Sequence, residues 1–297
     1  MNLNNDFSKI DECEYFELID ISKYSTIKLK AVGNIVIVKT IEALEKSIKL
    51  LNEKKIKFLI VGWGANQVLV NTESVVLIKL SFEFDRSSYG ELLKEYTFPA
   101  SAPLTFLTSL ASKYGLKGWE VFTGIPASVG GAVYMNAGTA LGEIGSLVKS
   151  IKVLDENLKI KTIRVDQNSF SYRKNNIVKS NEVILEVTMI HQGSDENIKE
   201  KIKEYLNYRK TTQPLSTKNC GCVFKNYDQN HKAGQFIDVC GLKGLTSNGL
   251  RVSHQHANFI ENTTEADGND FLGLIDVLKY ELELFSGIEF ELEAKVY

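Results

Sequence analysis

Apolar residues recur with a helical period in one early segment and run continuously in the next. In residues 40–56 they stand three or four positions apart, which predicts an amphipathic helix. The run KFLIVG at 57–62 predicts a buried strand, and alternation within 24–38 predicts one or two further strands. A strand–helix–strand order of this kind is typical of an α/β unit.

The remainder of the chain predicts a β-rich part between helices. A second amphipathic helix is expected to end at Gly115, because glycine is a common helix stop. A break near residue 205 is the expected boundary of a last domain. Helices are predicted at 101–116, 196–210 and 269–287, and strands at 150–155, 159–165, 182–190 and 256–262.

Composition describes an ordinary globular protein. The chain has 297 residues, is 43% hydrophobic and 24% charged, and carries a net charge of -2, so neither a nucleic-acid partner nor disorder is indicated. Its first twenty residues are polar and acidic, unlike a secretory signal, and its apolar runs are too short to span a bilayer. We therefore expect a cytoplasmic protein, and four cysteines in such a chain predict no disulfide framework.

Two of the four cysteines, Cys220 and Cys222, stand in the segment NCGCVFKN. A zinc site would need a second pair of ligands at fixed spacing, and C-x-C is not the C-x-x-C redox motif. Two interpretations remain open from the residues alone. The thiols can be small packing residues, or Gly221 and the polar Lys225–Asn226 that follow can form a tight turn at a ligand.

Two glycine-rich segments also suggest a ligand. VGWGAN at 61–66 follows the predicted buried strand, where exposed backbone N–H groups can meet phosphate oxygens. GIPASVGGAVYMNAG at 124–138 contains four glycines, which permit a close approach of backbone to a large flat group. A tightly packed turn is the alternative for the second segment. By spacing alone, Arg173, Lys243 and Glu293 are ordinary solvated charges.

Together these segments resemble the UDP-N-acetylenolpyruvoylglucosamine reductase (MurB) family, in its short subgroup without an extra substrate-covering loop. The resemblance runs from about residue 24 to the end. It is carried by 124–138, Tyr172–Arg173, Arg209–Pro214, Asn219–Asn226, Gly241–Gly244, His256–Ile260 and the closing ELEAK at 291–295.

The resemblance implies an α+β enzyme. Its FAD-binding region would be two-part and vanillyl-alcohol-oxidase-like (PCMH-type), and a C-terminal α+β domain would bind substrate. The expected division is 1–80 and 81–205 for the two FAD-binding subdomains and 206–297 for the substrate domain. The implied activity is reduction of UDP-N-acetylglucosamine-enolpyruvate to UDP-N-acetylmuramate in peptidoglycan precursor synthesis, with FAD as cofactor and NADPH as co-substrate.

The resemblance also implies catalytic roles. Hydride would pass from FAD to carbon three of the enolpyruvyl group, and Arg173 and Glu293 would stabilise the enolate-like intermediate. Cys222 stands where the family has a serine that protonates carbon two. A thiol with an ordinary pKa of about 8.5 is mostly protonated at neutral pH and can donate. Cys220 would then be the packing residue.

The implied binding residues form two sets. Those expected along the substrate, with cationic groups meeting its diphosphate, are Tyr172, Lys225, Asn226, Lys243 and His256. Those expected to hold FAD are Gly62, Gly64, Ala65, Asn66, Gly124, Ile125, Pro126, Ser128, Gly130, Gly131, Ala132, Asn136 and Gly138.

Departures from the family pattern keep two other functions open. Trp63 puts bulk in a loop that reads close to G-G-G-S-N in the family, which would suit a catalytically inactive binding protein. The second alternative is an FAD-dependent sugar or alcohol oxidase of the same fold. Such oxidases often tether flavin through a histidine near this loop, but all four histidines here lie at 191 or later.

Overall fold

The computed structural model describes residues 3–70 and 72–297, which form two compact units. Of the boundaries between these units, four fall inside a strand or a helix and one lies between Gly62 and Trp63. Unit 1 comprises Met1–Tyr15, Val36–Gly62 and Leu77–Asn207, and unit 2 comprises Phe16–Ile35, Trp63–Val76 and Tyr208–Tyr297.

Helix α2 (Ile41–Glu53) confirms the first predicted helix. The hydroxyl oxygen of Thr40 accepts a hydrogen bond from the N–H of Ala43 at 3.1 Å, which satisfies one of the unpaired donors at the helix start. The apolar stripe that predicted the helix is its buried face. The strand expected after it is β3 (Lys57–Val61), but only Val61 in it is buried, so the expectation of a buried strand is met in position and not in burial.

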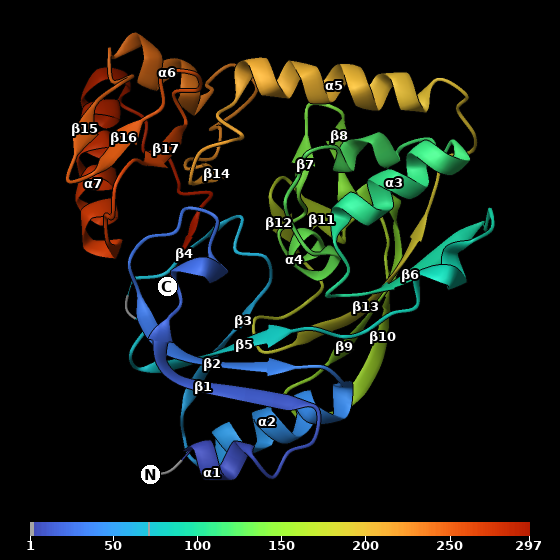
Figure 1. Cartoon of the computed structure of the whole chain (residues 1–297). Helices are drawn as coiled ribbons and strands as arrows, with labels where there is room; N and C mark the ends of the chain where they lie inside the picture. Colours follow the sequence, from blue (N-terminus) through green and yellow to red (C-terminus); the bar gives the residue numbers. More distant parts are fainter. Residues whose placement is uncertain (1–2, 71) are drawn as a thin grey trace. The chain divides into compact units, whose positions relative to one another are not determined.

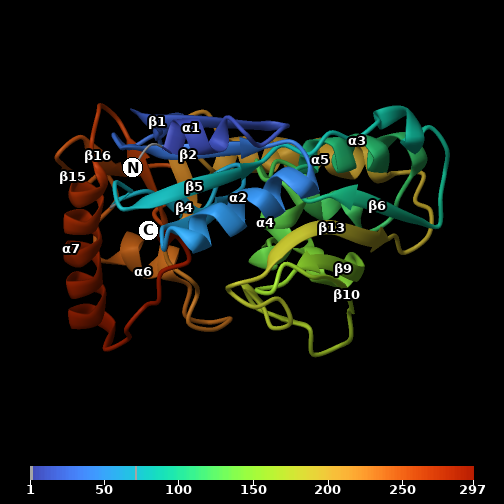
Figure 2. The ribbon, with the colours of Figure 1, turned by 90° about the horizontal axis from the view of Figure 1, so that it is seen from below.

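An antiparallel sheet and two helices make up most of unit 1. The sheet runs in the order β10 (Ile160–Arg164), β9 (Val148–Leu154), β13 (Val183–Ile190) and β6 (Glu95–Pro99). Helices α3 (Leu104–Tyr114) and α4 (Val129–Tyr134) cover one of its faces (Figure 1, Figure 2). α3 ends at Gly115 with φ 69°, as predicted, whereas α4 lies inside the glycine-rich segment, where no regular element was expected.

The core between this sheet and these helices is aromatic. Tyr96, Phe98, Trp119 and Phe122 are all nearly inaccessible to solvent and pack edge-to-face or stacked on one another. The indole N–H of Trp119 donates to the carbonyl oxygen of Ile190 at 2.8 Å, so its one polar atom is satisfied. This core gives the glycine-rich segment a rigid support.

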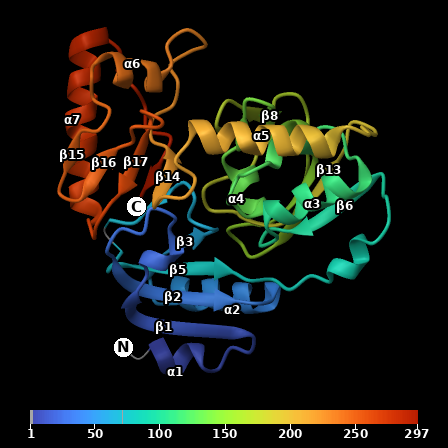
Figure 3. The same cartoon turned by 45° about the horizontal axis from the view of Figure 1, so that its top comes forward.

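Unit 2 is built on a second antiparallel sheet with helix α7 packed along it (Figure 3). The sheet order is β14 (Asn219–Cys222), β17 (Phe259–Asn262), β16 (Leu250–Val252) and β15 (Thr246–Ser247). α7 (Gly268–Ser286) starts at a capping box of Asp267 and Asp270, ends at Gly287 and contacts α6 (Ala233–Val239).

Three distant parts of the sequence share the core of unit 2. Ile27 and Leu29 pack with Val68, and both groups pack with the C-terminal residues around Cys220 and Leu278. The short strand β4 (Gln67–Val68) pairs in parallel with β18 (Lys295–Val296) near the end of the chain. The predicted split into two FAD-binding subdomains and a substrate domain concerns ligands and stays a prediction.

A further sheet has the order β1-β2-β5-β3. Strand β1 was not predicted, because no residue in it is buried and its sequence carries no apolar alternation. Within the described ranges, no helix is both long and apolar enough to cross a membrane. The remaining elements are α1 (Leu3–Phe7), β1 (Cys13–Asp20), β2 (Val32–Val38), β5 (Val75–Leu80), β7 (Gly138–Thr139), β8 (Gly142–Glu143), β11 (Phe170–Ser171), β12 (Lys174–Asn175) and α5 (Ile198–Thr212).

Candidate functional site

Two of the three predicted catalytic residues, Cys222 and Glu293, lie on adjacent backbone segments of unit 2. The N–H of Glu293 donates to the carbonyl oxygen of Val223 at 2.7 Å. The neighbouring residues Phe224 and Leu292 form an antiparallel β-bridge, which continues the pairing of the two segments. The fold therefore holds the backbones of Cys222 and Glu293 at a fixed separation although they are far apart in sequence.

The two cysteines of C-x-C differ in burial, although residues two apart in a regular strand share a face. Gly221 has φ 78°, and the pairing of β14 with β17 shifts register between Asn219 and Cys222. This irregularity breaks the alternation, so that Cys220 is 1% exposed and Cys222 is half-buried.

Burial raises the pKa of Cys220 to about 12, and the negative charge of Glu293 adds to the effect. Cys220 therefore stays a protonated thiol within the apolar core, which confirms its prediction as a packing residue. Cys222, the partly accessible thiol of the pair, is the one that can meet a ligand.

The loop at 63–66, predicted to hold FAD, contacts the segment that carries Glu293. The side-chain amide of Asn66 donates to the carbonyl oxygen of Glu293 at 2.9 Å, and the N–H of Lys295 donates to the carbonyl oxygen of Asn66 at 2.9 Å. A Cβ atom on Gly221 would lie 3.9 Å from the carbonyl oxygen of Ala65. Trp63 is 43% exposed.

The predicted substrate-binding lysines of unit 2 are both in ion pairs. The ammonium of Lys225 lies 2.7 Å from a carboxylate oxygen of Glu291, and that of Lys243 lies 2.7 Å from one of Asp238. Asn226 accepts a hydrogen bond from the N–H of Ala233, at the start of α6. These partners keep the side chains in place, and both acids are solvent-exposed enough to release the lysines to a phosphate.

His256, predicted to lie along the substrate, is a half-buried residue of unit 2. Burial lowers its pKa, and the nearby charge of Lys243 lowers it further. Its ring packs edge-to-face on Phe259, and Nδ1 accepts a hydrogen bond from the N–H of Asn258. The imidazole is therefore neutral near pH 7, and positive charge in this part of unit 2 has to come from the lysines.

Arg173, the third predicted catalytic residue, belongs to unit 1. It stands with Tyr172 in the tight turn between β11 and β12, and its φ of 54° is unusual for a residue other than glycine. One guanidinium nitrogen donates to the carbonyl oxygen of Gly138 at 3.1 Å, and another lies 3.7 Å from a carboxylate oxygen of Glu143. Backbone strain of this kind clusters at functional sites, which supports a role for Arg173.

Asn136 bonds to the residues around Arg173. It is 1% exposed, and its amide donates to a carboxylate oxygen of Glu143 at 2.7 Å and to the carbonyl oxygen of Ser171 at 2.9 Å. Its own oxygen accepts from the N–H of Gly145. With both amide hydrogens used and its side chain buried, Asn136 has no side-chain N–H left to donate to a cofactor. Glu143 was not found from the sequence, because a single glutamate in LGEIG carries no signal.

The glycine-rich segment of unit 1 packs closely against Gly62. A Cβ atom on Gly62 would lie 3.0 Å from the hydroxyl oxygen of Ser128 and 3.8 Å from Cα of Gly131, which is itself exposed. Gly62 and Gly131 are thus neighbouring residues without side chains, of which Gly131 is exposed. The ammonium of Lys79 donates to the carbonyl oxygen of Gly62 at 3.4 Å, and burial lowers its pKa; this lysine was not predicted there.

The other residues predicted for FAD have mixed surroundings. Gly130 lies so close to Ala100 that a Cβ atom would come within 2.6 Å of it, which makes Gly130 a packing requirement. Gly64 is buried. Gly124, Ile125 and Gly138 are half-buried, Pro126 is exposed, and Ser128 and Ala132 are buried.

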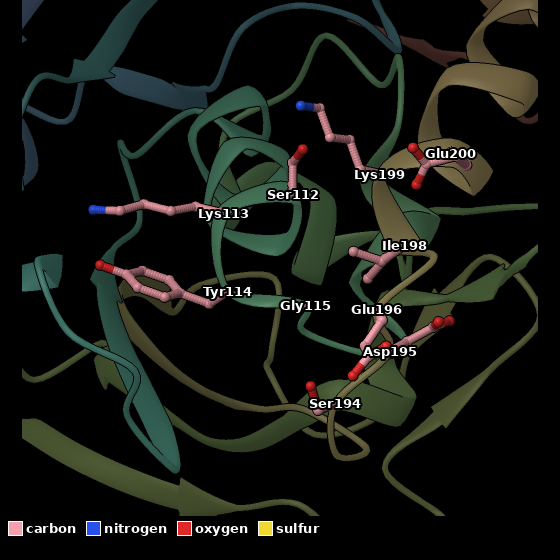
Figure 4. A pocket seen from close by; sticks show the side chains of 10 residues that line it. All are labelled: Ser112, Lys113, Tyr114, Gly115, Ser194, Asp195, Glu196, Ile198, Lys199 and Glu200. Carbon is pink, nitrogen blue, oxygen red and sulfur yellow. The ribbon is translucent and has the colours of Figure 1, made fainter.

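A hollow of about 440 Å³ lies elsewhere in unit 1, between the end of α3 and the start of α5 (Figure 4). It contains none of the predicted site residues. The carboxylate of Asp195 in its wall already pairs with Lys201 at 2.6 Å. No group of three histidine, cysteine or acidic side chains within the described ranges could hold a metal ion.

Two segments of the chain match the sequence profiles of known domains, and these define the class of protein. Residues 33–164 match the sequence profile of an FAD binding domain, and residues 213–297 match that of the UDP-N-acetylenolpyruvoylglucosamine reductase, C-terminal domain. The chain is thus a flavoprotein of the PCMH-type fold, with a second domain characteristic of one family of reductases.

Relatives then define the family. The chain is 36% identical to the UDP-N-acetylenolpyruvoylglucosamine reductase of Clostridium botulinum (strain Alaska E43 / Type E3), covering 86% of this chain and 84% of the relative. It is 34% identical to that of Halalkalibacterium halodurans, covering 93% and 92%. The crystal structure of the reductase from Thermus caldophilus superposes with a TM-score of 0.79 at 28% identity, covering 96% of this chain and 98% of that one. This chain belongs to the UDP-N-acetylenolpyruvoylglucosamine reductase family.

Proposed function

We propose that this protein reduces UDP-N-acetylglucosamine-enolpyruvate to UDP-N-acetylmuramate in peptidoglycan precursor synthesis, using FAD and NADPH. The hydrogen bond between Glu293 and Val223, the residue after Cys222, carries the proposal, because it brings the backbones of the proposed proton donor and of a carboxyl group into one part of unit 2. A cytoplasmic location belongs to the same proposal.

The chemistry between NADPH and carbon three of the enolpyruvyl group is hydride transfer, which bound FAD would supply. Gly62 and Gly131 would lie against it with bare backbone. The thiol of Cys222 holds the proton that goes to carbon two, so that one hydride and one proton saturate the double bond. The thiolate left behind regains its proton from water before the next turnover.

Arg173 and Glu293 stabilise the enolate-like intermediate in this proposal. Fixed groups act best when they need no reorganisation as charge develops. In unit 1, the Gly138 carbonyl and Glu143 hold the guanidinium of Arg173. In unit 2, the backbone of Glu293 is fixed on both sides, by Val223 and by Asn66.

The substrate's diphosphate would meet Lys225 and Lys243, which exchange their ion pairs with Glu291 and Asp238 for phosphate oxygens. His256 would contribute as a neutral hydrogen-bonding group. Tyr172, whose ring lies under the guanidinium of Arg173, would contact the substrate.

The test is turnover by the purified holoprotein. With NADPH and UDP-N-acetylglucosamine-enolpyruvate, we expect NADPH oxidation that depends on the nucleotide sugar, and a product heavier by two hydrogen atoms in mass spectrometry. Oxygen consumption with a sugar or alcohol, and no reaction with the enolpyruvyl sugar, would instead establish the oxidase alternative. No turnover of either kind would favour a binding protein.

A further inference from the structure

Asn66 holds the backbone around Glu293 with two hydrogen bonds. Its side-chain amide donates to the Glu293 carbonyl oxygen at 2.9 Å, and its own carbonyl oxygen accepts from the N–H of Lys295 at 2.9 Å. Between these contacts lies Ala294, which is 3% exposed. On the other side, the N–H groups of Glu293 and Ala294 both donate to the carbonyl oxygen of Val223, at 2.7 and 3.2 Å. Glu293 is thus clamped between Asn66 and the residue next to Cys222.

The loop that carries Asn66 is itself fixed within unit 2. The carbonyl oxygen of Gly64 accepts from both the N–H and the hydroxyl of Thr26, at 3.1 and 3.3 Å. The hydroxyl of Ser25 donates to the carbonyl oxygen of Gln67 at 2.6 Å. The segment 25–26 therefore anchors both sides of Asn66.

We propose that Asn66 is a positioning residue that sets the orientation of Glu293 in the reaction, rather than a residue whose side chain holds FAD. This inference rests on the proposed function, since it needs Glu293 to act on the substrate. The side-chain amide is directed at a main-chain carbonyl of the C-terminal segment, so Asn66 acts through the backbone of Glu293.

The chemistry of the contact explains why asparagine is suited to it. The Glu293 carbonyl needs an N–H or O–H donor, which the carboxylate of an aspartate cannot supply at neutral pH. Alanine at position 66 would remove the amide that donates to the Glu293 carbonyl oxygen, so that the backbone at Glu293 could shift. Displacements of about 1 Å at a catalytic group can slow a reaction by about 100-fold.

The experiment measures both half-reactions of the holoenzyme under anaerobic conditions for Asn66→Ala. We expect unchanged FAD content and NADPH reduction within about twofold of wild type, with reoxidation by the enolpyruvyl sugar slowed by about 10- to 100-fold. In the Glu293→Gln background, Asn66→Ala should slow reoxidation little further, because both substitutions impair the same action of Glu293. Asn66→Ser, which keeps a shorter donor, should recover part of the rate.

Asn262→Ala is the matched control. The Asn262 amide also donates to main-chain carbonyls of unit 2, those of Ile27 and Lys28 at 3.1 and 2.9 Å, but none of these belongs to the proposed site. It should lower stability and leave the two half-reaction rates in their wild-type ratio.

Loss of FAD from Asn66→Ala and Asn66→Ser, with a normal substrate rate in the fraction that keeps FAD, would overturn the proposal and make Asn66 a cofactor residue. Additive effects with Glu293→Gln would overturn it as well. A wild-type protein that is not reoxidised by the enolpyruvyl sugar would refute the proposed function itself, which separates the two failures.

Discussion

The N–H of Glu293 donates a 2.7 Å hydrogen bond to the carbonyl oxygen of Val223, the residue that follows Cys222. Main-chain hydrogen bonds do not depend on the side chains that flank them. Substitutions of the Cys222 or Glu293 side chain should therefore leave the pairing intact and report on chemistry instead of folding.

Cys222→Ala should lose the proton donor while keeping the flavin. We expect reduction by NADPH at the wild-type rate and reoxidation by the enolpyruvyl sugar slower by about 10²- to 10⁴-fold, the usual contribution of a general acid. Cys222→Ser should remain active, because a hydroxyl can donate in the same place. Stopped-flow absorbance of the flavin measures both steps.

Cys220→Ser is the control for that series. It buries a hydroxyl in an apolar core, so the free energy of unfolding should fall by about 1–3 kcal/mol. The rates of both of its half-reactions should stay near those of wild type.

The outcome that would contradict the role of Cys222 is equal turnover in Cys222→Ala and wild type.

Glu143→Gln should weaken the hold on Arg173 in unit 1. Glutamine can still accept from Asn136 but has no charge to pair with the guanidinium. We expect kcat to fall by about tenfold, with KM for NADPH and the free energy of unfolding little changed. Glu186→Gln, which removes an ion pair with Lys152 in the same unit, is the control and should leave kcat unchanged. A kcat equal to wild type in Glu143→Gln would show that Arg173 needs no such partner.

Gly64→Ala should destabilise the protein strongly. Gly64 has φ 70°, and a Cβ atom there would lie 2.0 Å from the carbonyl oxygen of Tyr24. We expect a loss of more than about 2 kcal/mol in the free energy of unfolding, measured by urea titration. Gly273→Ala is the contrast: it sits in α7, a Cβ atom there meets nothing, and we expect a gain of about 0.5–1 kcal/mol. A tolerated Gly64→Ala would contradict the described loop.

His256 should make stability depend on pH. Its folded pKa lies below the ordinary value of 6.5, so the unfolded state binds more protons between the two pKa values. Stability should therefore be complete above about pH 6.5 and fall as the pH drops from there through the folded pKa. His256→Gln should show a shallower fall between pH 7 and 5 in urea titrations. An identical slope in both proteins would mean that His256 is not buried as described.

Local patterns predicted most of the regular structure. The stripe of α2, the glycine stop of α3 and the apolar runs of β9 and β13 each reflect interactions within a few residues. Helix α4 was missed because its glycines are poor helix formers, and its start depends on the Ser128 cap and on packing against Ala100.

Long-range pairing could not be predicted in the same way. Nothing local to VGWGAN indicates that Asn66 bonds to Glu293, and nothing in LGEIG indicates that Glu143 pairs with Arg173. The neutral state of His256 follows from burial among residues that the sequence does not place. The proposed reacting residues were predicted through family resemblance, whereas the groups that contact them could be identified only in the structure.

The most direct test of the central claim is the visible spectrum of the purified protein under anaerobic conditions, first with NADPH and then with UDP-N-acetylglucosamine-enolpyruvate. We predict a yellow protein that bleaches with NADPH and recovers its colour with the enolpyruvyl sugar, which would establish both half-reactions together. Bleaching without recovery would contradict the proposed substrate, and a colourless protein that takes up no added FAD would contradict the flavin site.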